Sequence, residues 1–192
     1  MCTVVILRRP GHDWPLLLAA NRDEMRDRPW APPARHWPER DQVVAGIDLE
    51  ASGTWLGLND DGLVAAVLNR PQSLGPAAGY RSRGELPLEA LDHADADAAA
   101  RALADIDPAA YRTFNMVVAD GRDAFWLRSA GGEEGAAEEA GVEVMALPEG
   151  LSMITAHDRN DPSDPRIRDT LPRFRAAPAP DPGAGDWASW QA

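Results

Sequence analysis

The second residue of the chain, Cys2, is its only cysteine. It directly follows the initiator methionine, which is commonly removed when the second residue is small. The processed chain would then carry a thiol and a free α-amine on the same residue. An α-amine has an ordinary pKa of about 7.7–8.0, so it is partly neutral near pH 7 and can take the thiol proton. Cys2 is therefore a candidate N-terminal nucleophile, and its alternative role is that of a small apolar core residue.

The residues that would face Cys2 follow from a predicted hairpin. The apolar runs at 2–8 and 16–20 predict two strands, and turn-forming residues at 10–13 join them. Partners in a hairpin lie at equal distances from the turn centre and share a face of the sheet. The partner of Cys2 therefore lies between Asn21 and Asp23, within the polar tetrad Asn-Arg-Asp-Glu at 21–24.

The tetrad offers both charges that a thiol nucleophile with an amine base would use. Asp23 would hold the terminal ammonium group, and Arg22 would supply positive potential that favours the thiolate. Asn21 joins them as a candidate ligand-binding residue. The alternative is that four consecutive polar residues form only the solvated end of a strand.

A proline-rich stretch follows the tetrad and contains two tryptophans. Residues 25–41 predict a long ordered loop without regular structure, because proline removes backbone donors and restricts the chain. Trp30 and Trp37 would either line an apolar pocket or anchor this loop by packing.

A second hairpin places an amide at the end of a buried strand. Residues 52–58 lead through a turn at 59–62 into the apolar run 63–68, which predicts a strand covered on both faces. Asn69 follows that strand, just before an X-Pro break. We interpret it as a candidate oxyanion donor, with an ordinary turn residue as the alternative.

The remaining elements complete one domain. We expect a single domain over residues 1–176, followed at 177–192 by a Pro/Ala/Gly linker and the start of a helix capped by Asp186. A flexible acidic loop is expected at 129–141. Further helices are predicted at 82–93, 94–106 and 166–176, and further strands at 114–119, 124–127, 142–146 and 151–155.

Composition excludes several classes of partner. The chain has 192 residues and a net charge of −12, and all 19 of its basic residues are arginine. Such acidity argues against binding to nucleic acid or to anionic membranes. No secretory signal or membrane-spanning run is found, so we expect a cytoplasmic protein without membrane insertion. We find neither a phosphate-binding loop nor a paired-cysteine zinc motif, and we expect no metal and no organic cofactor.

Three motifs occur in order along the chain: Met1-Cys2-Thr3, the tetrad at 21–24, and Gly53-Thr54-Trp55-Leu56-Gly57. They resemble the NRDE proteins, the transport-and-Golgi-organisation family, whose namesake is the tetrad. The resemblance runs from Met1 to about Arg175. It implies an α+β fold similar to the N-terminal-nucleophile hydrolases, a four-layer αββα sandwich with two antiparallel sheets between helix layers.

The resemblance also implies roles for individual residues. The stretch 57–63 followed by Asn69 is similar to the segment of penicillin V acylases and bile salt hydrolases that ends in an oxyanion-hole asparagine. In that group an arginine and an aspartate on the second strand lie beside the cysteine. Asp23 takes the place of the aspartate. The acylase arginine lies three residues before it, where this chain has Ala20, so Arg22 departs from the pattern.

The later part of the chain also departs from the acylases. They carry a second active-site asparagine on a later strand, where this chain has Thr155-Ala156-His157, and a C-terminal strand with a further arginine. We expect the chain to be a shortened version or a fragment that ends before such a strand. An open sheet edge and the exposed Trp187 and Trp190 would then favour homo-oligomers.

Two functions are compatible with these residues. In the first, an amidase or acyl transferase acts on a C–N bond of a small-molecule substrate: Cys2 attacks, Asn69 stabilises the oxyanion and Asp23 orients the amine. In the second, the protein is a non-catalytic binder of an apolar ligand such as haem or an acyl conjugate, with Cys2 or a histidine as axial ligand. The candidate ligand-binding residues are Asn21, Trp30, Trp37, Trp55 and His157.

Overall fold

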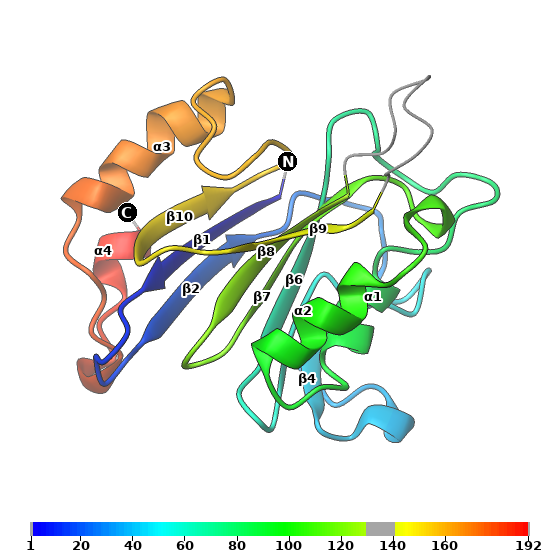
Figure 1. Ribbon diagram of the computed structural model, residues 1–192, viewed down its shortest axis with the longest axis horizontal. Coiled ribbons are helices and arrows are strands. Elements are labelled where there is room, and N and C mark those ends of the chain that lie inside the picture. Colours follow the sequence, from blue (N-terminus) through cyan, green and yellow to red (C-terminus); the bar gives the residue numbers. More distant parts are fainter. Residues whose placement is uncertain (1, 130–140, 192) are drawn as a thin grey trace.

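The computed structural model describes residues 2–129 and 141–191. Two antiparallel sheets are stacked face to face, and helices cover their outer surfaces (Figure 1). This is the four-layer αββα sandwich that the family resemblance implies. Met1, whose removal the sequence predicts, lies outside the described residues. So does most of the acidic loop expected at 129–141.

The smaller sheet contains the start of the chain. Its central strand, β1 (Thr3–Arg8), pairs with β2 (Leu16–Asn21) on one side and with β10 (Gly150–Ile154) on the other. Helix α3 (Pro165–Ala176) packs on its outer face. The strand that directly follows Cys2 is therefore paired on both sides.

The larger sheet has seven strands in chain order, from β3 to β9. Each strand pairs with the next along the chain, so the whole sheet is an antiparallel meander. Its strands are β3 (Trp30–Ala34), β4 (Val43–Asp48), β5 (Leu56–Asn59), β6 (Val64–Asn69), β7 (Phe114–Ala119), β8 (Ala124–Ser129) and β9 (Glu143–Ala146).

Strand β3 contradicts the expectation that residues 25–41 contain no regular element. It carries Pro32 and Pro33, yet it pairs with β4 at the edge of the larger sheet. An edge strand needs donors on only one side, so proline is tolerated there. The pairing register shifts between Ala31 and Ala34, around the two prolines, which is how the ladder accommodates their missing N–H groups.

The two helices on the larger sheet are shorter than predicted. Helix α1 (Glu85–Ala90) and helix α2 (Ala96–Ala104) replace the expected 82–93 and 94–106. The second begins at Asp95, whose side chain accepts a hydrogen bond from the backbone N–H of Ala98 and so caps the helix. Among the described residues, four other short helices lie at Pro38–Arg40, Pro108–Ala110, Pro182–Ala184 and Ala188–Gln191, the last being α4.

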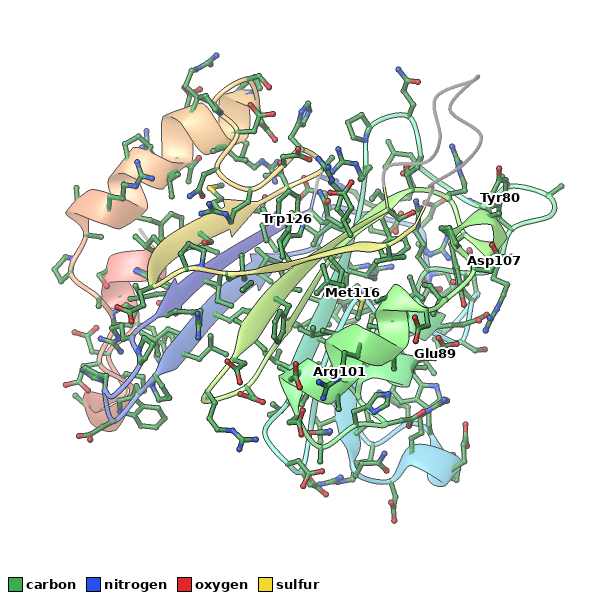
Figure 2. The ribbon with its side chains drawn as sticks, viewed as in Figure 1. Tyr80, Glu89, Arg101, Asp107, Met116 and Trp126 are labelled. Atoms are coloured by element: carbon green, nitrogen blue, oxygen red, sulfur yellow. The ribbon has the colours of Figure 1, made fainter. Side chains whose placement is uncertain are left out.

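Alternating side chains divide the core into three parts. Val4 and Ile6 of β1 face the larger sheet and pack with Trp126, which lies between the two sheets in Figure 2. Val5 faces the other way and packs with Ile167 of α3. The other face of the larger sheet carries Met116 toward α1 and α2 (Figure 2), within the largest cluster of buried residues. The strands thus alternate as a sheet buried on both faces requires.

Candidate functional site

The hairpin of β1 and β2 brings the tetrad beside Cys2. Thr3 pairs with Asn21, so the register places Cys2 level with Arg22, as the distances from the turn predict. The half-buried thiol lies at the end of β1, and its Sγ is 3.8 Å from the main-chain oxygen of Asp23. Cys2 and Asp23 therefore meet at one end of the smaller sheet.

The carboxylate of Asp23 is held on both of its oxygens. Asn21 Nδ2 donates to Oδ1 at 2.7 Å, and Arg166 Nη2 donates to Oδ2 at 2.9 Å. Arg166 lies in the first turn of α3 and also donates to Thr3 Oγ1 at 3.0 Å. The sequence gives no sign of this arginine, because the contact joins residues 143 positions apart. Arg166 positions Asp23 next to the start of β1.

Arg22 contacts Trp55 of the third motif. Its guanidinium lies over the ring of Trp55, with Cζ 4.1 Å from the ring centroid. It also forms ion pairs with Asp48 at 3.1 Å and with Glu24 at 3.3 Å. Arg28 Nε reaches the same Asp48 oxygen at 2.6 Å. The charge of Arg22 is therefore shared with two carboxylates, which weakens its effect on Cys2.

Asp48 is a structural acid that sequence reasoning missed. Burial raises its pKa, but the hydrogen bond from Arg28 and those from the backbone N–H groups of Ala51 and Glu50 outweigh burial, so the pKa lies below the ordinary value. Asp48 thereby fixes both the turn after β4 and the arginines of the segment after β2. The available signal was an aspartate between a strand and a Ser-Gly turn, which is typical of a side chain that bonds to nearby backbone.

A cavity of about 1100 Å³ opens where these elements meet. The structure places five of the predicted site residues on its wall: Cys2, Arg22, Asp23, Trp55 and Asn69. Cys2 lies just before β1, Arg22 and Asp23 just after β2, Trp55 just before β5, and Asn69 at the end of β6. The fold therefore brings residues that are far apart in the sequence to one cavity.

Asn69 is available to a ligand in this cavity. It is the last residue of β6 and is half-buried. Its side-chain amide makes no hydrogen bond with any residue that the structure describes. An amide without a protein partner that faces a cavity is free to donate to a carbonyl or oxyanion of a bound molecule.

The other predicted site residues lie elsewhere. Asn21 lines a second, smaller cavity beside α3. Trp30 is 54% exposed and packs edge-on against Trp55, with ring centroids 6.1 Å apart. Trp37 is buried behind the larger sheet, where its Nε1 donates to Ser52 O at 3.0 Å. The ring of His157 lies near Asp161, with Nδ1 3.8 Å from the carboxylate. None of these four is part of the wall of the large cavity in the described chain.

Asn115 is a second residue that sequence reasoning missed. It is fully buried in β7, and its Nδ2 donates to Thr155 O at 3.0 Å and to His157 O at 2.8 Å. Its Oδ1 accepts from Arg70 Nη1 at 2.8 Å and from Trp126 Nε1 at 3.1 Å. Asn115 therefore fastens the segment after β10 to the larger sheet, next to the site. The signal was an amide inside the apolar run at 114–119.

Gly53, the first residue of the third motif, lies against the backbone of another segment of the cavity wall. A Cβ on Gly53 would lie 2.6 Å from the backbone of Gly84, and Thr54 N donates to Gly84 O at 2.9 Å. Only glycine permits this approach of two backbones. The contact ties the start of the motif to the segment that carries Arg83, which lines the cavity together with Cys2.

Among the described residues, no group of three or more His, Cys, Asp or Glu side chains is arranged to hold a metal ion. None of the described helices has the length and apolar character needed to cross a bilayer.

The order of the helix and sheet layers identifies the fold. The fold is that of the N-terminal-nucleophile hydrolases. A search of solved structures finds the C2A mutant of a conjugated bile acid hydrolase from Clostridium perfringens, with a TM-score of 0.51 and 15% identity, over 79% of this chain and 53% of that one. This likeness concerns the fold alone.

A family model places the chain more closely. The model described as "Transport and Golgi organisation 2" matches residues 1–157, and the chain belongs to that family. It is 37% identical over 109 residues to a Transport and Golgi organization protein 2 homolog from Bos taurus, and 36% identical over 111 residues to the Homo sapiens homolog. Each match covers 55% of this chain and 38% of the relative. The chain thus aligns with well under half the length of these relatives.

Proposed function

We propose that this protein is a cysteine N-terminal-nucleophile amidohydrolase or acyl transferase that acts on the C–N bond of an acyl amide. One observation carries the proposal: Cys2, Asp23 and the unbonded amide of Asn69 share the wall of one cavity. They provide a nucleophile, a carboxylate for the terminal ammonium group and an oxyanion donor.

The proposed reaction has two halves. After removal of Met1, the α-amine of Cys2 takes the thiol proton, and the sulfur attacks the amide carbonyl to form an S–C bond. Asn69 donates a hydrogen bond to the oxyanion that develops. The tetrahedral intermediate collapses with cleavage of the C–N bond, and the α-ammonium returns the proton to the departing amine. Water, or a second amine, then attacks the thioester carbonyl and gives a proton to the α-amine. The S–C bond breaks, the acyl group leaves as a carboxylic acid or a new amide, and the proton returns to the Cys2 sulfur.

Asp23 and Arg166 would act through the α-amine. The carboxylate of Asp23 orients the ammonium form, and Arg166 holds that carboxylate at 2.9 Å from the helix side. A charged hydrogen bond of this kind fixes geometry as well as charge. Arg166 is thus a positioning residue, since its guanidinium acts on Asp23 and Thr3.

Exposed apolar side chains at the rim of the cavity favour a substrate with an apolar acyl group. Met25, Leu74 and Tyr80 all line the cavity, and they are 71%, 73% and 49% exposed. Tyr80 lies on the loop at the right-hand edge of Figure 2. Large apolar side chains left in water at a cavity mouth are typical of a binding surface. A hydrocarbon substituent of the substrate would cover them.

No specific observation favours the alternative of a haem or acyl-conjugate binder. That function would place Trp30, Trp37 and His157 around the ligand. In the described chain, none of these three residues lines the large cavity. Trp55 remains in the cavity, but Arg22 covers its ring at 4.1 Å.

The proposal is tested by amine release from a series of amides that differ in the length of an apolar acyl group. We expect release by the wild-type chain and none by Cys2→Ser. Asn69→Ala should lower kcat by roughly 10²–10³, the loss measured for one oxyanion donor elsewhere. Release that continues in Cys2→Ser would exclude this residue as the nucleophile.

A further inference from the structure

Two arginines of the cavity wall have no carboxylate partner within the described residues. Arg83 Nη1 donates to Ser73 Oγ at 2.9 Å and to Thr113 O at 3.0 Å. Arg112 donates only to main-chain oxygens of the 72–75 loop, among them Gln72 O at 2.6 Å. Neither forms an ion pair with another described residue. Neutral acceptors hold both guanidinium groups in place and leave their charge uncompensated.

The carboxylates of the same wall are already engaged. The chain has 31 acidic and 19 basic residues, so a shortage of acids does not explain the unpaired arginines. The cavity pairs are Asp23 with Arg166, Glu24 with Arg22, and Asp48 with Arg22 and Arg28.

The two guanidinium groups are close enough to affect each other. Burial lowers the pKa of Arg83 to about 10, and the like charge of Arg112 acts in the same direction, while an ionised Cys2 would act against it. Arg83 therefore stays protonated at pH 7, in partial burial and beside a second cation. An anion placed between the two arginines would relieve this repulsion.

We propose that Arg83 and Arg112 bind a carboxylate of the ligand in the cavity that contains Cys2. The planar guanidinium group suits a carboxylate, because its N–H donors match the two oxygens. The proposal rests on the proposed function for the reaction itself, and it adds the substrate class: an acyl amide that carries a carboxylate. Binding of the anion does not depend on turnover, so the two proposals fail separately.

The unique cysteine allows a direct test with two alkylating probes of similar size. Iodoacetate carries a carboxylate and iodoacetamide does not; with each, the Cys2 sulfur forms an S–C bond, iodide leaves and the thiol proton passes to the buffer. We expect the ratio of the iodoacetate rate to the iodoacetamide rate to exceed that of a synthetic peptide of residues 2–8 by roughly tenfold, as charge steering allows. The ratio should fall toward the peptide value in Arg83→Gln and in Arg112→Gln.

Arg81→Gln is the matched control. Arg81 also lines the cavity, but it already pairs with Glu85 and with Glu89, the latter at 3.1 Å. Its replacement should leave the ratio unchanged. A ratio equal to that of the peptide in the wild-type chain, or one that survives both the Arg83 and the Arg112 substitutions, would overturn the proposal.

A measurement on the unaltered chain guards against unfolding of the variants. Benzoate should protect Cys2 from iodoacetamide at concentrations where benzamide does not, and added salt should weaken this protection. Equal protection by both compounds, or by neither, would contradict an anion site. Because neither measurement requires amide cleavage, a chain without hydrolase activity can still pass this test.

Discussion

Replacement of Asn115 should destabilise the fold more than that of any exposed amide. Its amide makes four hydrogen bonds from a fully buried position, two as donor to the segment after β10 and two as acceptor from Arg70 and Trp126. A hydrogen bond contributes about 0.5–1.5 kcal/mol net, and one to a charged group about 1.5–3. Since the four bonds share one side chain and do not add fully, we expect Asn115→Ala to cost about 3–5 kcal/mol.

Urea unfolding followed by circular dichroism at pH 7 measures this loss. With a slope of about 2 kcal/mol per M, the midpoint should fall by roughly 2 M while the slope stays the same. Asn21→Ala is the matched control, because Asn21 is exposed and its side chain makes one hydrogen bond among the described residues, to Asp23. It should change the free energy of unfolding by no more than about 0.5 kcal/mol. A loss below about 1 kcal/mol in Asn115→Ala would refute the view that this amide fastens β10 to the larger sheet.

Two further predictions concern stability. Gly53→Ala places a Cβ 2.6 Å from the Gly84 backbone and should cost about 2 kcal/mol, whereas Gly121→Ala, whose Cβ would lie 3.6 Å from Pro15, should cost less than about 1 in the same urea assay. The lowered pKa of Asp48 contributes stability that is present above its unfolded value of about 3.9 and is lost as the pH falls through the folded value. Asp48→Asn should therefore lower the urea midpoint at pH 6 more than at pH 3, and an equal effect at both pH values would show that its ion pairs add nothing.

Local patterns were enough to predict most of the strands and the first hairpin. Alternating apolar runs and turn residues predicted the strands, and equal distances from one turn placed the tetrad beside Cys2 before any contact was known. The fold class followed from the family resemblance that these motifs carry, and the structure confirms it. The separate treatment of residues 177–192 stays a prediction, although Trp190 packs edge-on against Phe174 with ring centroids 5.3 Å apart.

What the sequence did not reveal are contacts between distant segments. Arg166 reaches Asp23, and Asn115 reaches the segment after β10, only because the two sheets and α3 are stacked. Arg83 and Arg112 meet at the cavity through loops that no local pattern orients. Trp37 was predicted as a candidate ligand-binding residue, but it is buried in the core. A tryptophan in a proline-rich stretch is equally compatible with a pocket wall and with the core, so the sequence alone does not decide between them.

In the proposed reaction, Cys2 becomes the acylated N-terminal residue of the active chain. Intact-mass spectrometry of the purified protein, before and during incubation with the amide series, tests it most directly. We expect a chain that starts at Cys2 and a transient mass increase equal to the acyl group, located on Cys2 and absent from Cys2→Ala. A chain that keeps Met1, or amide cleavage without any adduct on Cys2 under rapid quenching, would contradict the account.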